Sequence, residues 1–181
     1  MTTPIYTPTE ARTRETFLAL MWSLSYPSRT YALPETDLTD LALIGEALLD
    51  LDTSYFTTDA RLADQFVRLG ARSTSAADAD YHFYSTLNDA ALATMKQAKN
   101  GSMLRPDESA TIIVRCNIGT GDSFKWTGPG IMTQETVQLG GIPDTFWELH
   151  TRALRYPQGW DVYFVDGGRV IGLPRTTVVE G

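Results

Sequence analysis

Helical and strand-like segments alternate through the first half of this 181-residue chain, an order that restricts it to a layered fold of helices on a β-sheet. In the second half the strand-like segments gather around a single helix. The order predicts an α/β fold: a single layered domain with a mixed β-sheet flanked by helices. Strands are expected at residues 53–57, 81–85, 111–118, 123–127, 160–165 and 169–173.

Capping signals mark where the helices begin. Residues 7–10 (Thr-Pro-Thr-Glu) combine an N-cap, a proline in the first turn and the glutamate of a capping box. The first helix is expected to end before Pro27, because a proline disfavours helical backbone at the residue before it. The later helices are expected to start from Thr36 or Asp37, Asp59, Asn88 and Pro143.

Apolar spacing predicts which sides of these elements are buried. In the first helix, Phe17, Leu20, Met21 and Leu24 recur at helical intervals, so they are expected to face the sheet. In the strand at 111–118, every second residue from Ile112 to Ile118 is apolar, which places Ile112, Val114, Cys116 and Ile118 on one face.

Two glycine-containing turns predict hairpins. Residues 119–122 (Gly-Thr-Gly-Asp) favour a turn between the strands at 111–118 and 123–127. Residues 166–168 (Asp-Gly-Gly) favour another turn between the last two strands.

Length and composition support one domain over residues 1–181, with residues 1–8 as a flexible N-terminal arm. No apolar stretch is long enough to span a bilayer, and the first ten residues do not resemble a signal peptide. A cytoplasmic location without membrane contact is therefore expected. The net charge of −7 disfavours nucleic-acid binding. Twelve of the fifteen basic residues are arginines, so an anion is expected to meet an arginine fork.

Candidate catalytic groups are few. The two histidines, His82 and His150, belong to no metal-binding motif, and one cysteine cannot hold an iron–sulfur cluster. No phosphate-binding loop or dinucleotide fingerprint is present, and no metal or cofactor is expected. Cys116 could act as a nucleophile with a histidine, but its place in an apolar strand indicates a buried, inert thiol. No catalytic centre is evident, so the sequence leaves open whether the chain is itself an enzyme.

Two segments could bind a phosphate group or a partner protein. Gly128 and Gly130 flank Pro129 in a turn whose backbone N–H groups could contact an anion. Directly after the last strand, Arg175 stands beside Thr176 and Thr177, a combination suited to a phosphate or a carboxylate. The simpler interpretation is a turn that redirects the chain and an edge strand closed by proline, with a structural arginine.

The same segments resemble the PhnH family, the H subunit of the bacterial carbon–phosphorus lyase core complex. The resemblance covers about residues 17–179. One departure is Ser28, where the family usually has glycine. The residues that carry the resemblance are 159–165 (Gly-Trp-Asp-Val-Tyr-Phe-Val), 169–177 (ending Pro-Arg-Thr-Thr), 128–131 (Gly-Pro-Gly-Ile), 48–53, 17–21 and 25–27 (Ser-Tyr-Pro).

The resemblance implies a fold reminiscent of the core of pyridoxal-phosphate-dependent transferases, without that cofactor. It implies assembly with the G, I and J subunits, and a homodimer when the chain is isolated. In that pathway G, H and I, with the L protein, join a phosphonate to the ribose of ATP and release adenine. Because the chain lacks cluster cysteines and an evident acid–base pair, we expect a non-catalytic or supporting subunit.

Two other functions remain open on sequence grounds. One is a stand-alone cytosolic small-anion-binding protein, which would need a concave site lined by several arginines. The other is an enzyme that uses Cys116 and a histidine. Association with a partner is expected in either leading case, because large aromatic residues anchor interfaces, although core packing explains at least half of them. The candidate anchors are Trp126, Trp147, Tyr156 and Trp160.

Overall fold

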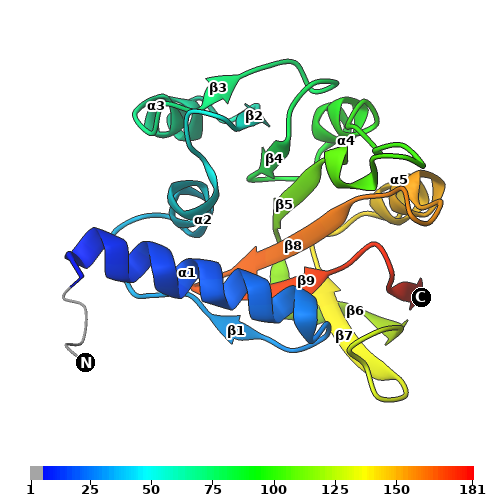
Figure 1. The fold of residues 1–181 in the computed structure, drawn as a ribbon. Helices are drawn as coiled ribbons and strands as arrows, with labels where there is room; N and C mark the ends of the chain where they lie inside the picture. The colour runs from blue at the N-terminus through cyan, green and yellow to red at the C-terminus, as the bar shows by residue number, and fades with distance from the viewer. Residues whose placement is uncertain (1–5) are drawn as a thin grey trace.

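The computed structural model describes residues 6–181, which form two β-sheets and two groups of helices (Figure 1). The helices are α1 (Pro8–Ser25), α2 (Asp40–Leu48), α3 (Ala60–Val67), α4 (Asp89–Met95), α5 (Asp144–Ala153) and the 3₁₀ turn η1 (Pro106–Glu108). The strands are β1 (Tyr31–Ala32), β2 (Ser54–Thr57), β3 (Arg72–Ser73), β4 (Tyr81–Tyr84), β5 (Thr111–Arg115), β6 (Asn117–Thr127), β7 (Glu135–Gly140), β8 (Asp161–Asp166), β9 (Arg169–Leu173) and β10 (Val178–Glu180).

The larger sheet is mixed, as the sequence predicts. Its seven strands lie in the order β1-β9-β8-β5-β4-β2-β3. Strands β8, β5, β4, β2 and β3 are parallel, whereas β9 is antiparallel to both β8 and β1. The smaller sheet is antiparallel and has the order β10-β6-β7. The hairpin predicted at residues 166–168 is confirmed between β8 and β9.

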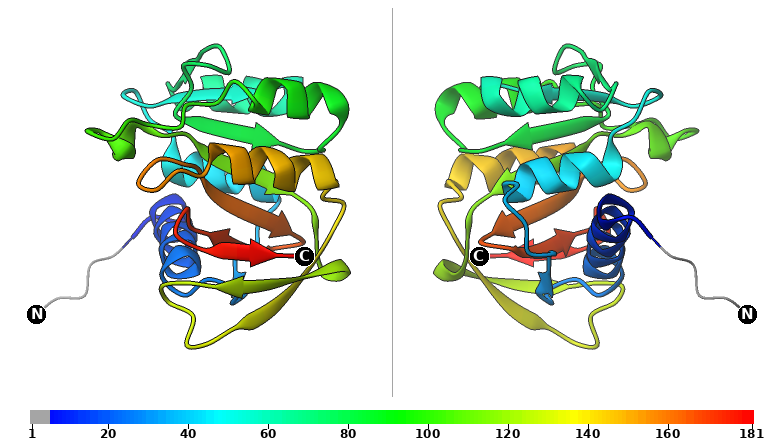
Figure 2. Two further views of the ribbon diagram at one scale, coloured as in Figure 1. Left: turned by 90° about the vertical axis from the view of Figure 1, so that its right-hand side faces the viewer. Right: turned by 90° about the vertical axis from the view of Figure 1, so that its left-hand side faces the viewer.

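Helices cover both faces of the larger sheet, and each face has its own core. Tyr55 and Ile113 point to the core formed with α1, α2 and α3. Ile112 and Phe164 point to the core formed with α4, α5 and the smaller sheet. Figure 2 shows these two faces in turn. The predicted common face of Ile112, Val114, Cys116 and Ile118 is confirmed, because all four lie in the second core.

The capping signals place most helix starts correctly. Thr7 and Glu10 form the complete capping box of α1, Asp59 caps α3 and Asn88 caps α4. The prediction for α2 is wrong by two or three residues. Its N-cap is Thr39, whose hydroxyl accepts a hydrogen bond from the Ala42 N–H at 3.3 Å.

The predicted buried face of α1 is confirmed for Leu20, with Leu24 partly buried against the same core, but it is wrong for Phe17 and Met21. Phe17 is 51% exposed and Met21 is also exposed, whereas the buried residues of α1 are Thr16, Ala19, Leu20 and Ser23. The cause is a close approach between α1 and β9. A Cβ added to Gly172 would lie 2.7 Å from the Ser23 carbonyl group, so small side chains occupy this face of the helix.

The predicted hairpin at residues 119–122 is also wrong. The chain leaves the larger sheet after Arg115, and β6 runs without reversal from Asn117 to Thr127. Gly119 and Gly121, both with positive φ, produce a bulge instead: the β6–β7 pairing shifts register between Ile118 and Asp122, and both residues stand opposite Leu139. Strands β7 and β10, which flank β6, were not expected.

A flexible N-terminal arm is expected over residues 1–8. Residues 1–5 lie outside the described part of the chain. The expectation is wrong for Thr7 and Pro8, because Thr7 caps α1 and Pro8 is its first residue. Among residues 6–181, no helix combines the length and the apolar character needed to cross a membrane.

Candidate functional site

The fold brings the two predicted binding segments together. A Cβ added to Gly128 would lie 2.9 Å from the Thr176 carbonyl oxygen, so this glycine permits direct backbone contact. Gly130 makes a similar contact with the end of α1, where an added Cβ would lie 2.5 Å from the Ser25 carbonyl oxygen and 2.7 Å from Pro27. Both glycines have positive φ. The turn therefore sits between α1 and the segment that leads to β10.

Arg175 is held by contacts within the chain. Its Nη2 and Nε donate to the two carboxylate oxygens of Asp161 at 2.6 and 3.3 Å, and its backbone N–H donates to the same carboxylate at 2.9 Å. Nη1 donates to the Pro106 carbonyl oxygen at 2.6 Å. The guanidinium group thereby ties η1, the start of β8 and the C-terminal segment together. Contact with a phosphate or a partner stays a prediction for Arg175, Thr176, Thr177, Gly128 and Gly130.

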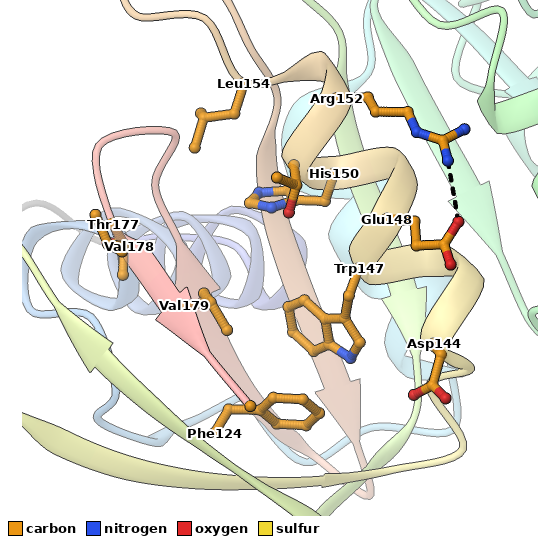
Figure 3. A pocket seen from close by; sticks show the side chains of 12 residues that line it. Phe124, Asp144, Trp147, Glu148, His150, Arg152, Leu154, Thr177, Val178 and Val179 are labelled. Carbon is orange, nitrogen blue, oxygen red and sulfur yellow. Dashed lines mark hydrogen bonds and ion pairs between the residues drawn. The ribbon is translucent and has the colours of Figure 1, made fainter.

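Two neighbouring cavities form a groove beside this segment. One, of about 480 Å³, is lined by Pro129, Tyr156 and residues 175–178. The other, of about 580 Å³, lies between α5 and β10 (Figure 3). Both cavities include Leu154, Thr177 and Val178. We call the two together the C-terminal groove.

Polar atoms without partners lie in the wall of the C-terminal groove. The Thr177 hydroxyl and His150 Nε2 are buried and have no hydrogen-bond partner among the described residues, and the same holds for Trp147 Nε1. In Figure 3 the His150 ring extends from α5 toward the side of the cavity that carries Thr177 and Val178. An unsatisfied buried polar group costs about 1–3 kcal/mol, so a ligand or partner that enters here gains by bonding to them.

The charges around the C-terminal groove do not favour a free anion. Burial lowers the pKa of His150 to about 4, which leaves its ring uncharged at neutral pH. Arg152 forms an ion pair with Glu148 at 3.2 Å. Phe124 and Trp147 form an aromatic wall with ring centroids 4.4 Å apart. This environment suits an uncharged, largely apolar group that carries a hydrogen-bonding atom.

The structure gives no support to a Cys–His catalytic pair. Burial raises the pKa of Cys116 to about 12, and within residues 6–181 the thiol has no hydrogen bond to either histidine. His82 contacts the Tyr84 hydroxyl through Nδ1 at 3.2 Å, and burial lowers its pKa to about 4. No group of three or more His, Cys, Asp or Glu residues in the described chain is placed to hold a metal ion.

The prediction that core packing explains at least half of the four candidate anchors is confirmed. Trp126 and Trp160 are buried in the core, and only Tyr156 of the four candidates is well exposed, at 74%. Exposed apolar residues gather instead on α1 and at its end: Phe17, Met21, Trp22 and Tyr26, with Trp22 and Tyr26 stacked at 5.7 Å between ring centroids.

A second site was missed by sequence reasoning. Arg61 at the start of α3 and Arg115 at the end of β5 line one cavity of about 330 Å³, although 54 positions separate them in the sequence. The only signal in the sequence is that Arg115 lies between the apolar residues Val114 and Cys116, which places it on the opposite face of the predicted strand.

Comparisons with known proteins agree on one family. Residues 5–180 match the family described as bacterial phosphonate metabolism protein (PhnH). The putative C-P lyase subunit protein HtxG of Stutzerimonas stutzeri is 31% identical over 172 residues, which cover 93% of this chain and 86% of that protein. The alpha-D-ribose 1-methylphosphonate 5-triphosphate synthase subunit PhnH of Rhizobium meliloti (strain 1021) is 33% identical over 94 residues, which cover 50% of this chain and 46% of that protein. With a match over nearly its whole length, this chain belongs to the PhnH family.

Proposed function

We propose that this protein is a supporting subunit of the carbon–phosphorus lyase core complex, active in phosphonate utilisation in the cytoplasm. Its step is the one that joins a phosphonate to the ribose of ATP and releases adenine. The family match and the names of both relatives support a subunit role in phosphonate metabolism. The proposed partners are the G, I and J subunits, and in their absence a second copy of this chain. The expected likeness to pyridoxal-phosphate-dependent transferases stays a prediction.

The observation that carries this proposal is the exposed apolar surface of α1. Phe17 and Trp22 are 51% and 44% exposed, and Met21 and Tyr26 are exposed beside them. Aromatic residues and methionine are enriched where proteins associate, and a set of them on one exposed helix indicates a partner.

This surface is connected to the C-terminal groove. The turn that contains Gly130 packs against the backbone of Ser25, at the end of α1, and its Pro129 lines the groove. The exposed Tyr156 lies on the same groove. We infer that partner subunits dock on this continuous surface, which we call the docking surface: Phe17, Met21, Trp22, Tyr26, Pro129, Tyr156 and the C-terminal groove.

The protonation states of the two histidines and the cysteine agree with a subunit that does not itself carry out the reaction. Both histidines are uncharged and buried at neutral pH, and the one thiol is protonated. A general acid or base works best when its pKa lies near the operating pH. The residues that carry out the glycosyl exchange are therefore expected on other subunits.

Co-expression tests the proposal. The chain carries an affinity tag, candidate G, I and J subunits are expressed with it, and the stoichiometry of the purified complex is measured. We expect a stable complex that is lost in Phe17→Ser/Trp22→Ser, because both changes remove apolar area from the docking surface. Val67→Ser is the control, since Val67 is an apolar residue that is even more exposed but lies on α3, away from the docking surface. Soluble partners that never co-purify with the wild-type chain would contradict the proposal.

The stand-alone anion-binding protein remains the second candidate. The observation that favours it is the cavity with Arg61 and Arg115, a concave site lined by arginines.

A further inference from the structure

The cavity with Arg61 and Arg115 lies where the sheet topology changes direction. From β2 the chain passes through α3 to β3, on one side of β2 in the sheet. From β4 it passes through α4 to β5, on the opposite side. The two helices pack on opposite faces, since Leu62 of α3 and Leu92 of α4 belong to different cores. In open α/β sheets, ligands bind outside the carboxyl ends of the strands at such a point.

Two adjoining cavities occupy this position. The cavity of about 330 Å³ includes Asp59, Arg61, Ser85 and Arg115. A second cavity, of about 660 Å³, also includes Asp59, Arg61 and Ser85, and adds Thr86 and other polar residues. We call them together the switch-point cleft. Its size is that of small-molecule sites, and it does not overlap the docking surface.

The charges of the switch-point cleft favour an anion. Neither Arg61 nor Arg115 forms an ion pair with a carboxylate among residues 6–181. The one carboxylate in the smaller cavity, Asp59, accepts the backbone N–H groups of Arg61 and Leu62 at 2.9 and 3.4 Å. Two arginines and a single carboxylate therefore line the smaller cavity, in a chain whose net charge is −7.

The side chains around the two arginines add donors. Ser85 lines both cavities together with Arg61, and Thr86 lines the larger one, so both residues supply hydroxyl groups to the cleft. Arginine forks match the oxygens of a tetrahedral oxyanion, and hydroxyl groups complete its hydrogen bonds. An uncharged ligand would leave both guanidinium groups without a counter-charge.

We propose that the switch-point cleft binds a small molecule through a phosphonate or phosphate group, held by Arg61 and Arg115 with the hydroxyl groups of Ser85 and Thr86. The site goes beyond the subunit role and rests on the cleft alone, so it applies to the isolated chain as well as to the complex.

Titration calorimetry on the isolated protein tests this site, with methylphosphonate and inorganic phosphate as separate probes. We expect saturable binding at one site per chain. Arg61→Ala and Arg115→Ala are each expected to weaken it at least tenfold, roughly the effect of losing one charged hydrogen-bonding partner. Arg68→Ala is the control, because Arg68 is exposed at the other end of α3 and lines neither cavity. Tighter binding of methylphosphonate than of phosphate would assign the site to phosphonates, and the reverse to phosphate esters.

Either of two results would overturn the site: no saturable binding of either probe to the wild-type chain, or an equal loss of binding in Arg68→Ala. If an alanine variant melts early, Arg61→Lys and Arg115→Lys keep the charge but remove the fork and are expected to weaken binding by a smaller factor. The co-expression experiment is independent, because Arg61→Ala and Arg115→Ala leave the docking surface unchanged. A variant that loses anion binding but still assembles with the other subunits would therefore report on the cleft alone. Failure of the wild-type chain to assemble would report on the subunit role.

Discussion

Arg175 and Asp161 form a two-pronged ion pair, with Nη2–Oδ2 and Nε–Oδ1 distances of 2.6 and 3.3 Å. The pair is largely shielded from water, and the fourth contact of Arg175, to the Pro106 carbonyl oxygen, adds η1 to the same junction. An arginine directly after the last strand of the larger sheet thus fixes how the chain turns toward β10.

We predict that Arg175→Ala destabilises the fold by about 2–3 kcal/mol, because it leaves a shielded Asp161 carboxylate without its cation. Urea unfolding measures this. Arg105→Ala is the control, since Arg105 pairs with Glu108 on the exposed surface, where such pairs contribute less than about 1 kcal/mol. Equal effects of the two changes would contradict this account. The same variant also tests the function of Arg175. If Arg175→Ala still assembles fully and supports full phosphonate turnover, the prediction that Arg175 contacts a phosphate or a partner is wrong.

Ser28 has a backbone φ of +76°, in the left-handed region that glycine adopts freely. The PhnH family, which this chain resembles in sequence, usually has glycine at this position. We predict that Ser28→Gly stabilises the fold by up to about 1 kcal/mol, and that Ser28→Val destabilises it, because a β-branched residue fits this region poorly. Thermal unfolding of the two variants decides the point, and a less stable glycine variant would show that the Ser28 side chain matters more than its backbone.

The two buried histidines predict a loss of stability in mild acid. Burial lowers the pKa of His82 and His150 from the ordinary 6.5 to about 4. Between these values the unfolded chain binds protons that the folded chain does not, so stability falls as the pH falls from 6.5 toward 4. The expected loss between pH 7 and 5 is about 2 kcal/mol for each histidine.

Denaturant unfolding at pH 7 and pH 5 measures this loss. His150→Gln is expected to reduce it by about half, because one of the two titrating groups is gone. A loss that is unchanged in both His150→Gln and His82→Gln would assign the acid sensitivity to other groups.

Cys116 is predicted to be unreactive in the folded protein. Burial raises its pKa to about 12, so almost no thiolate is present at neutral pH. We expect iodoacetamide to modify the thiol in denaturant but not under native conditions, as mass spectrometry would show. Rapid modification of the native protein would contradict this prediction and support the alternative in which the chain is an enzyme that uses Cys116 and a histidine.

Local signals in the sequence predicted local structure well. The caps at Thr7, Asp59 and Asn88 and the β8–β9 hairpin are set by residues within a few positions of each other. The predictions were wrong where packing against a segment distant in the sequence determines which residues are buried. Spacing alone favours Phe17 and Met21 as the buried face of α1, but Gly172 of β9 admits the helix so closely that the small residues turn inward.

The same distinction between local and distant information applies to the candidate sites. The turn at Gly128 and the segment at Thr176 were both singled out in the sequence, yet only the fold shows that they touch. Arg61 and Arg115 carry no motif. They line one cavity because β2, β4 and β5 are parallel neighbours, so the ends of these strands and the segments after them lie at one edge of the sheet.

As a supporting subunit, this chain is expected to be needed for adenine release while the reacting groups lie on other subunits. The most direct measurement is adenine release from ATP and methylphosphonate by purified G, I and L proteins, with and without this chain. We predict that release needs this chain and that the chain alone releases none. Release at the same rate without it, or release by the chain alone, would contradict the account.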